Sequence, residues 1–186
     1  MDNLERFFLD RKDTLLVIID IQDRLARVMK ERETVVNNVL HLVELAKLFN
    51  MPVVVTEQYP RGLGPTVAEL KDALGDNLPI EKITFSCSET EHFRDTLKKI
   101  DRKKVLLTGM ETHVCVLQTC LDLLRDGYRV HLVTDATTSR KPDDKSVAVE
   151  FMRDAGAVIT CTETVLFQIL KKAGTEEFKV ISRRIK

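Results

Sequence analysis

The chain has 186 residues, of which 44% are hydrophobic and 31% charged, and it carries 29 basic and 29 acidic side chains. This length and composition predict one globular domain over residues 1–186. The balanced charge gives no electrostatic support for binding nucleic acid, and the chain has neither a transmembrane apolar run nor a signal-peptide core. We therefore expect a cytoplasmic protein without nucleic-acid or membrane partners. The four cysteines show no CxxC spacing, which indicates reduced thiols and no zinc site.

The first apolar run covers residues 15–19 and ends on Asp20. A continuous apolar run predicts a strand buried on both faces, with the carboxylate at its carboxyl end, where α/β sheets bind ligands. Asp20 could instead do no more than cap a turn. The elements expected next are a helix over residues 34–49, a strand over 52–57, a loop rich in Pro and Gly over 58–66 and a helix over 67–74.

The middle of the chain carries a lysine in a short segment, residues 79–83, that is weak as a strand. A lone lysine such as Lys82 is usually a solvated surface charge. A helix over residues 88–100 follows, with apolar residues at helical spacing.

Residues 103–124 combine a short buried strand over 105–107, a tight turn and an amphipathic helix. Cys115 falls in the first turn of this helix, with Thr112 as the expected N-cap. The helix macrodipole and the unpaired N–H groups there favour a thiolate, which would lower the pKa of Cys115 and make it a nucleophile. The alternative is a small buried core residue, because free cysteine is often buried.

The last third of the chain continues the alternation of strands and helices. We expect a strand over 128–134, a polar turn over 135–139, a helix over 143–155, a strand over 157–161, a helix over 164–172 and a short edge strand over 178–181. Five or six strands alternating with helices predict a three-layer α/β/α sandwich with a mostly parallel, Rossmann-like sheet. GxGxxG, P-loop and GxSxG motifs are all missing from the sequence, which argues against dinucleotide binding, P-loop chemistry and a serine hydrolase.

Three patterns in chain order, LLVIIDIQ, EKITFS and LLTGMETHVCV, resemble those of the isochorismatase-like cysteine hydrolases. This superfamily includes nicotinamidases, N-carbamoylsarcosine amidases and isochorismatases. The resemblance covers most of the chain, and GMETHVCV is its most specific part. The loop TEQYPRGLGPT looks like that of the branch called isochorismatase domain-containing proteins.

The resemblance implies a catalytic triad of Asp20, Lys82 and Cys115. Cys115 would attack a carbonyl carbon, Asp20 would take the thiol proton and pass it to the leaving amine, and Lys82 would keep Asp20 ionised and stabilise the thiolate. The resemblance also implies a non-proline cis peptide between Met110 and Glu111. This bond would aim the backbone N–H groups of Glu111 and Cys115 into one oxyanion hole.

Other residues are candidates for the substrate pocket by their placement alone. The family does not use the histidine beside the nucleophile as its base, so we expect it to line the pocket or to be structural. The pocket candidates are Gln22, Gln58, Tyr59, Phe85, Thr112 and His113.

The chain departs from nicotinamidases in the loop after the second strand, which lacks their Asp-x-His pattern and further histidine. This departure argues against nicotinamide hydrolysis and against a metal, so we expect no metal and no cofactor. The intact Cys115 favours cleavage of a C–N bond in a small amide, carbamoyl or related substrate over isochorismatase-type hydrolysis of a vinyl ether.

Two other classes of function stay open at this point. The chain could be a non-catalytic binding protein on the same fold, or a redox-active thiol protein, although Cys120 is badly placed on the helix to pair with Cys115. The resemblance also implies a homo-oligomer, with the loop 56–66 and the apolar tail near Ile181 as its expected contact surfaces.

Overall fold

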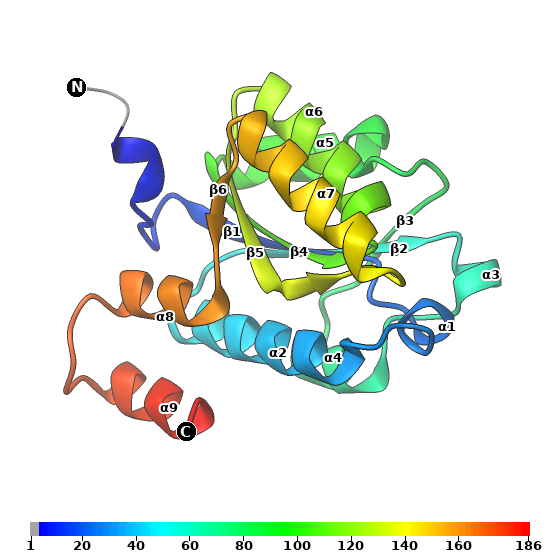
Figure 1. Cartoon of the computed structure of the whole chain (residues 1–186). Coiled ribbons are helices and arrows are strands. Elements are labelled where there is room, and N and C mark those ends of the chain that lie inside the picture. The colour runs from blue at the N-terminus through cyan, green and yellow to red at the C-terminus, as the bar shows by residue number, and fades with distance from the viewer. Residues whose placement is uncertain (1–3) are drawn as a thin grey trace.

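The centre of the fold is a parallel sheet whose strands follow the order β3-β2-β1-β4-β5-β6 (Figure 1). The computed structural model describes residues 4–186. The strands are β1 (Thr14–Ile19), β2 (Val53–Gln58), β3 (Ile80–Lys82), β4 (Lys104–Met110), β5 (Arg129–Thr138) and β6 (Val158–Thr160). The expected mostly parallel α/β sheet is confirmed, and the weak segment around Lys82 forms an edge strand.

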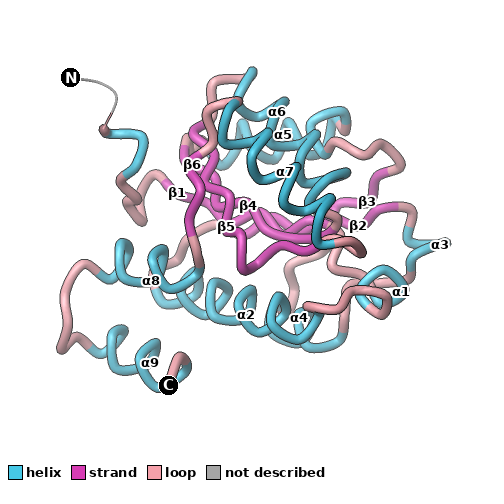
Figure 2. The backbone as a smooth tube through the Cα atoms, viewed as in Figure 1, coloured by secondary structure: helices cyan, strands magenta, loops and turns pink. Residues whose placement is uncertain are grey.

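Helices cover both faces of this sheet and complete a three-layer sandwich (Figure 2). One layer contains α2 (Arg32–Leu48), α4 (Ala68–Leu74), α8 (Thr162–Leu170) and α9 (Glu176–Arg184), and the other contains α5 (Glu91–Ile100), α6 (Leu117–Arg125) and α7 (Pro142–Asp154). Two short helices, α1 (Asp23–Ala26) and α3 (Pro60–Leu63), lie where β1 and β2 end (Figure 1).

The apolar run from Leu15 to Ile19 in β1 is explained by the burial of this strand on both faces. All six of its residues are buried. Successive side chains point to opposite faces, so Leu16 and Ile18 join the core under α2 while Leu15 and Val17 join the core under α5 and α6. A strand covered on both faces needs apolar residues at every position.

The tail is the clearest error among the predicted elements. Residues 178–181 are part of helix α9, and the predicted edge strand is wrong. Thr175 caps this helix by accepting a hydrogen bond from the Phe178 N–H at 3.1 Å, and Ile181 is fully buried against the chain's own core. Ile181 is therefore not an exposed contact surface in the folded chain.

Gly109 allows β4 to approach the end of β1 closely, just before the chain continues from β1 into Asp20. Its φ is +125°, and a Cβ atom built on it would lie 2.1 Å from the carbonyl oxygen of Ile19. That distance is far inside van der Waals contact with rigid backbone, so only glycine fits this position.

We predict that Gly109→Ala lowers the free energy of unfolding by about 3 kcal/mol, because backbone must move to make room. Gly127→Ala is the matched control, since Gly127 also has a positive φ of 83° but no atom within 4 Å of the added Cβ. It should cost only about 1 kcal/mol. Urea unfolding measures both values, and equal losses would contradict the role given to the Gly109 contact.

Candidate active site

The carboxyl ends of three neighbouring strands bring Asp20 and Lys82 together. Asp20 directly follows β1, and Lys82 is the last residue of β3. Strand β2 lies between them, and the lysine side chain reaches across it, so that its Nζ lies 2.6 Å from Asp20 Oδ2. Neither side chain has any solvent exposure. The pair is therefore a buried ion pair, and the lysine is not a solvated surface charge.

Asp20 is held by Thr56 from two directions. Asp20 has a left-handed φ of 52°, and its N–H donates to the Thr56 carbonyl at 3.2 Å. The Thr56 hydroxyl donates to Asp20 Oδ1 at 2.7 Å, and the Cys87 thiol lies 3.7 Å from the same hydroxyl. Our sequence interpretation missed Thr56 and Cys87. The available signal was a polar residue at the end of the second apolar run.

The Lys82 ammonium makes hydrogen bonds beyond Asp20. It donates to Gln58 Oε1 at 2.7 Å and, at longer distance, to the carbonyls of Thr84 at 3.3 Å and Phe85 at 3.2 Å. Burial is the largest single influence and lowers the pKa of Lys82, but the charge of Asp20, the hydrogen bond to it and the nearby thiols of Cys87 and Cys115 together outweigh burial, and the net pKa is raised. The lysine is therefore an ammonium at neutral pH.

Cys115 lies on an unusual turn rather than in the first turn of an α-helix. Strand β4 ends in a cis peptide bond between Met110 and Glu111, and residues Thr112–Val116 then form one turn of π-helix before α6. Such turns are frequent at functional sites. The expected N-cap is wrong, because the capping position is Glu111 and no side chain caps the turn.

Burial raises the pKa of the Cys115 thiol, and the negative charge of Asp20 raises it further. The expected lowering of this pKa is therefore wrong. The helix-terminus argument fails because the thiol is only 5% exposed and faces a carboxylate, and both features oppose a second negative charge. The site therefore holds a protonated Cys115 thiol near the Asp20 carboxylate that is paired with the Lys82 ammonium.

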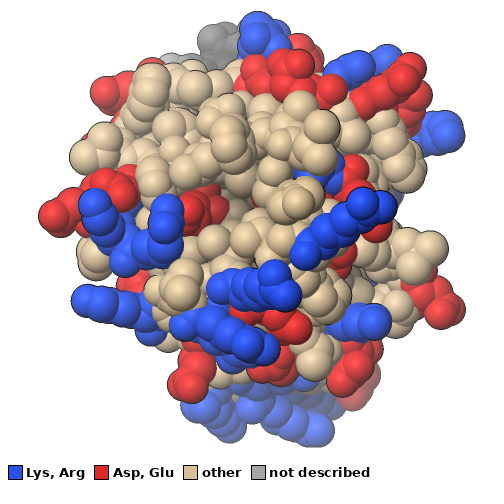
Figure 3. Space-filling view, turned by 90° about the vertical axis from the view of Figure 1, so that its right-hand side faces the viewer, with Lys and Arg blue, Asp and Glu red and all other residues tan. Residues whose placement is uncertain are grey.

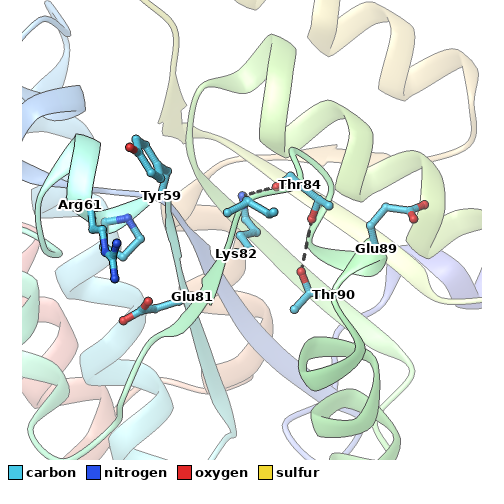
Figure 4. Close-up of a pocket in the computed structure, with 9 residues that line it drawn as sticks. Tyr59, Arg61, Glu81, Lys82, Thr84, Glu89 and Thr90 are labelled. Atoms are coloured by element: carbon cyan, nitrogen blue, oxygen red, sulfur yellow. Dashed lines mark hydrogen bonds between the residues drawn. The ribbon is translucent and has the colours of Figure 1, made fainter.

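A cavity of about 570 Å³ opens beside this cluster (Figure 4). Tyr59, Pro60 and Arg61 form one part of its wall, and Lys82 lies in another part. Glu81 and Glu89 also line it, so the wall carries both signs of charge. The face of the molecule that bears α1 and α3 likewise shows basic and acidic side chains close to one another (Figure 3). Because both signs of charge are present, neither the cavity wall nor this face of the molecule selects for a strongly charged substrate.

The six expected pocket residues are placed very differently. Tyr59 lines the cavity, and Phe85 is half exposed next to Lys82. His113 Nδ1 lies 2.9 Å from Ser139 Oγ, and its Nε2 lies 3.7 Å from Asp144 Oδ2.

The other three expected pocket residues are buried. Thr112 has no exposure, and its hydroxyl has no hydrogen-bond partner among residues 4–186. Gln22 and Gln58 both use their amide groups in hydrogen bonds within the protein. These two amides are therefore part of the site's framework.

Among the described residues, no three His, Cys, Asp or Glu side chains come close enough to hold a metal ion. Over the same part of the chain, no helix has the length and apolar character required to span a bilayer.

The chain is similar to proteins of one family along most of its length. The family model described as Isochorismatase domain matches residues 14–164. A secreted isochorismatase effector of Phytophthora sojae (strain P6497) is 44% identical over 177 residues, which are 93% of this chain and 84% of that protein. Vertebrate proteins named isochorismatase domain-containing protein 2 match at 35% to 38% identity. Because the Phytophthora relative is named as secreted, a cytoplasmic location stays a prediction.

Solved structures with the same fold carry different names. The structure of a MAR1 ribonuclease from Caenorhabditis elegans is 36% identical with a TM-score of 0.89, and the match covers 96% of this chain and 92% of that one. The YcaC gene product of Escherichia coli, described as an octameric hydrolase of unknown specificity, is 27% identical with a TM-score of 0.89. That match covers 95% of this chain and 90% of that one.

The raised pKa values of three buried thiols predict that the folded protein becomes less stable at alkaline pH. Burial raises the pKa of Cys120 to about 12, and burial with the charge of Asp20 raises that of Cys87 to about 11; the pKa of Cys115 is raised as well. The unfolded chain therefore loses these protons first as pH rises above about 9. The free energy of unfolding should fall by about 1.4 kcal/mol per pH unit for each thiol.

Urea unfolding under reducing conditions between about pH 9 and pH 10 measures this slope, below the ordinary pKa of lysine. Cys120→Ala should reduce the slope by the share of one thiol. Val116→Ala, which removes buried methyl groups and no thiol, should leave the slope unchanged. An unchanged slope in Cys120→Ala would show that this thiol does not titrate differently in the folded chain.

Proposed function

Because the chain belongs to the isochorismatase family, we propose that it is a cysteine hydrolase that cleaves a C–N bond of a small amide, carbamoyl or related substrate. One observation carries the proposal. Asp20 and Lys82 form a fully buried ion pair with Nζ and Oδ2 2.6 Å apart, and the negative charge of this aspartate acts on the nearby buried thiol of Cys115. A nucleophile, a base within reach and a third group that orients the base are the parts that covalent catalysis requires.

In the first half of the proposed reaction, Cys115 Sγ attacks the carbonyl carbon while its proton passes to Asp20. The carbonyl π bond breaks and the oxygen becomes an oxyanion, for which the backbone N–H groups of Glu111 and Cys115 are the proposed donors. The oxyanion electrons then re-form the carbonyl, the C–N bond breaks, and Asp20 gives its proton to the leaving nitrogen. The products of this half are a free amine or ammonia and a thioester on Cys115.

In the second half, water attacks the thioester carbon and Asp20 takes the proton from the water. The C–S bond breaks, and the Cys115 sulfur regains a proton from Asp20. Lys82 does not transfer a proton in either half. Its positive charge offsets the negative charge of Asp20. This keeps the Asp20 carboxylate available as a base inside the protein.

The raised pKa of Cys115 shapes this mechanism. A thiolate formed in advance would place two negative charges side by side in a buried site, which is unfavourable. Transfer of the proton to Asp20 during the attack keeps the total charge of the site constant. The reaction therefore depends on the carboxylate more than it would in an enzyme whose thiol has a low pKa.

We also propose that the chain forms a homo-oligomer, as the similar YcaC gene product is described to do. Leu78 is 82% exposed, Ile83 81% and Phe85 54%, and all three lie next to the edge strand β3. An apolar cluster beside a sheet edge fits an interface between copies of a chain.

Light scattering coupled to gel filtration should give a mass of two or more chains, and Leu78→Glu with Ile83→Glu should lower it. Val147→Glu with Phe151→Glu is the matched control, because these residues of α7 are exposed as well. A mass of one chain for the unmodified protein would remove the proposal.

Turnover of a panel of small amides, ureas and carbamates, followed by released ammonia or amine, tests the proposed hydrolysis. Cys115→Ala should lower turnover of any substrate found by about a thousandfold or more, because no other group can form the thioester. Asp20→Asn should lower it by about a hundredfold or more. Cys120→Ala, which removes a thiol from the next turn of the helix, should retain activity.

Turnover that persists in a folded Cys115→Ala variant would contradict the proposed nucleophile. A vinyl ether belongs in the panel as the alternative substrate class. A short RNA belongs there because a similar structure is titled a ribonuclease. If the protein cleaves the vinyl ether or the RNA in a Cys115-dependent way and cleaves none of the amides, that reaction would take the place of C–N hydrolysis as its function. No turnover at all would favour a binding protein.

A further inference from the structure

We propose that Gln58 is a positioning residue that holds the Lys82 ammonium against Asp20, and that Gln22 locks Gln58 in place for this purpose. The inference deepens the proposed function and rests on it for its catalytic meaning. Sequence analysis placed both glutamines in the substrate pocket. Their hydrogen bonds indicate a different role.

The protons of the Lys82 ammonium are fully used within the described residues. An ammonium has three protons. One goes to Asp20 Oδ2 at 2.6 Å, one to Gln58 Oε1 at 2.7 Å, and the third faces the carbonyls of Thr84 and Phe85 at 3.2 to 3.3 Å. Gln58 is thus the only side chain besides Asp20 among residues 4–186 that hydrogen-bonds this ammonium at short distance. Without it, a buried proton of the lysine would lose its acceptor.

The Gln58 side chain is itself fixed at its other end. Its Nε2 donates to the Ile83 carbonyl at 2.8 Å, one residue beyond Lys82. This bond sets which way the amide faces, because it requires the nitrogen toward Ile83 and the oxygen toward the ammonium. An amide with both ends bound inside the protein has little freedom to turn toward a substrate.

Gln22 holds the backbone of Gln58 with a reciprocal pair of bonds. Gln22 Oε1 accepts from the Gln58 N–H at 2.7 Å, and Gln22 Nε2 donates to the Gln58 carbonyl at 3.0 Å. The same Nε2 donates to the Gly64 carbonyl at 2.7 Å. Gln22 has no exposure, so these bonds are made inside the protein. Gln22 therefore anchors the segment 59–64, which forms part of the cavity wall. Through Gln58 it also anchors the Lys82 ammonium.

The chemical identity of Gln58 matters because an amide oxygen accepts a hydrogen bond but does not take up a proton at physiological pH. A carboxylate in its place would compete with Asp20 for the ammonium and offer a second base to the Cys115 proton. It would also add a negative charge to a cluster whose ionisable members are Asp20, Lys82, Cys87 and Cys115. A neutral acceptor leaves Asp20 as the single base of the site.

The test follows the Lys82 ammonium by NMR in protein labelled with ¹⁵N- and ¹³C-lysine, with Lys82→Met used to assign the signal. Gln58→Met removes the acceptor and should lower the midpoint pH of the Lys82 ¹³Cε chemical-shift titration by about one unit. Gln58→Glu adds a charge and should raise that pH. Two shifts of opposite sign are expected only if Gln58 contacts the charged form of the lysine directly.

Gln118→Met and Gln118→Glu are the matched controls, since Gln118 is exposed on α6 and is not among the hydrogen-bond partners of the Lys82 ammonium. Both should leave the signal unchanged. Gln22→Met should move the Lys82 signal less than Gln58→Met does, because Gln22 does not touch the ammonium. Unchanged Lys82 titration in the folded Gln58 variants, or shifts of the same sign, would overturn the proposal. If Gln58→Met does not fold, the sign of the shift in Gln58→Glu decides alone.

The NMR experiment needs no substrate, so its outcome is independent of the proposed hydrolysis. Where a substrate is found, Gln58→Met should lower kcat about tenfold and change KM little, because Gln58 acts through Lys82 and Asp20. A change confined to KM would place Gln58 in the substrate pocket instead. NMR shifts of opposite sign together with no turnover of any substrate would keep the positioning role and remove the proposed function.

Discussion

A lysine and an aspartate without solvent exposure lie 2.6 Å apart at the carboxyl ends of the strands, and the neighbouring side chains satisfy the hydrogen bonds of this pair. Moving two charges out of water costs several kcal/mol per ion, and their attraction compensates only when the remaining donors and acceptors are satisfied. The Thr56 hydroxyl donates a hydrogen bond to one oxygen of Asp20, and Gln58 Oε1 accepts a hydrogen bond from the Lys82 ammonium. Since apolar residues of similar size would fold as well or better, the pair is better explained by chemistry than by stability.

The pair also determines the state of Cys115. Burial and the negative charge of Asp20 keep the pKa of the neighbouring thiol high, and in the proposed mechanism the same carboxylate accepts the thiol proton. In that mechanism, activation of Cys115 rests on a base that Lys82 keeps available. Burial and the Asp20 carboxylate influence the pKa of Cys115 more than the position of this thiol at the start of a helix does.

The fold was largely predictable from the sequence because its strongest signals are local. Continuous apolar runs such as 15–19 have one common explanation, a parallel strand covered on both faces, and helical spacing is equally direct. The tail was mispredicted because Phe178 to Ile181 suits a strand locally. Only the tertiary structure shows that this segment is helical, with Thr175 as its cap and Ile181 buried against the core.

The candidate site was predictable in its residues but not in its physical state. Asp20 ends an apolar run, Cys115 lies in the strand–turn–helix unit of residues 103–124, and the resemblance to a family drew attention to Lys82. Burial, however, depends on the whole fold, and burial reverses the expected pKa shift of the thiol. Likewise, Gln58 suits a substrate or an internal partner equally well, and only distances decide between them.

The most direct test of the central claim is acylation by p-nitrophenyl acetate, with the acetyl group located by peptide mass mapping. If the Lys82–Asp20 pair activates Cys115, the acetyl group should appear on buried Cys115 in preference to Cys161, which is the more exposed of the two. A folded Lys82→Met variant should acylate Cys115 at least about tenfold more slowly. Acetylation of Cys161 with Cys115 left unmodified, or equal acylation of Cys115 in both proteins, would contradict the account.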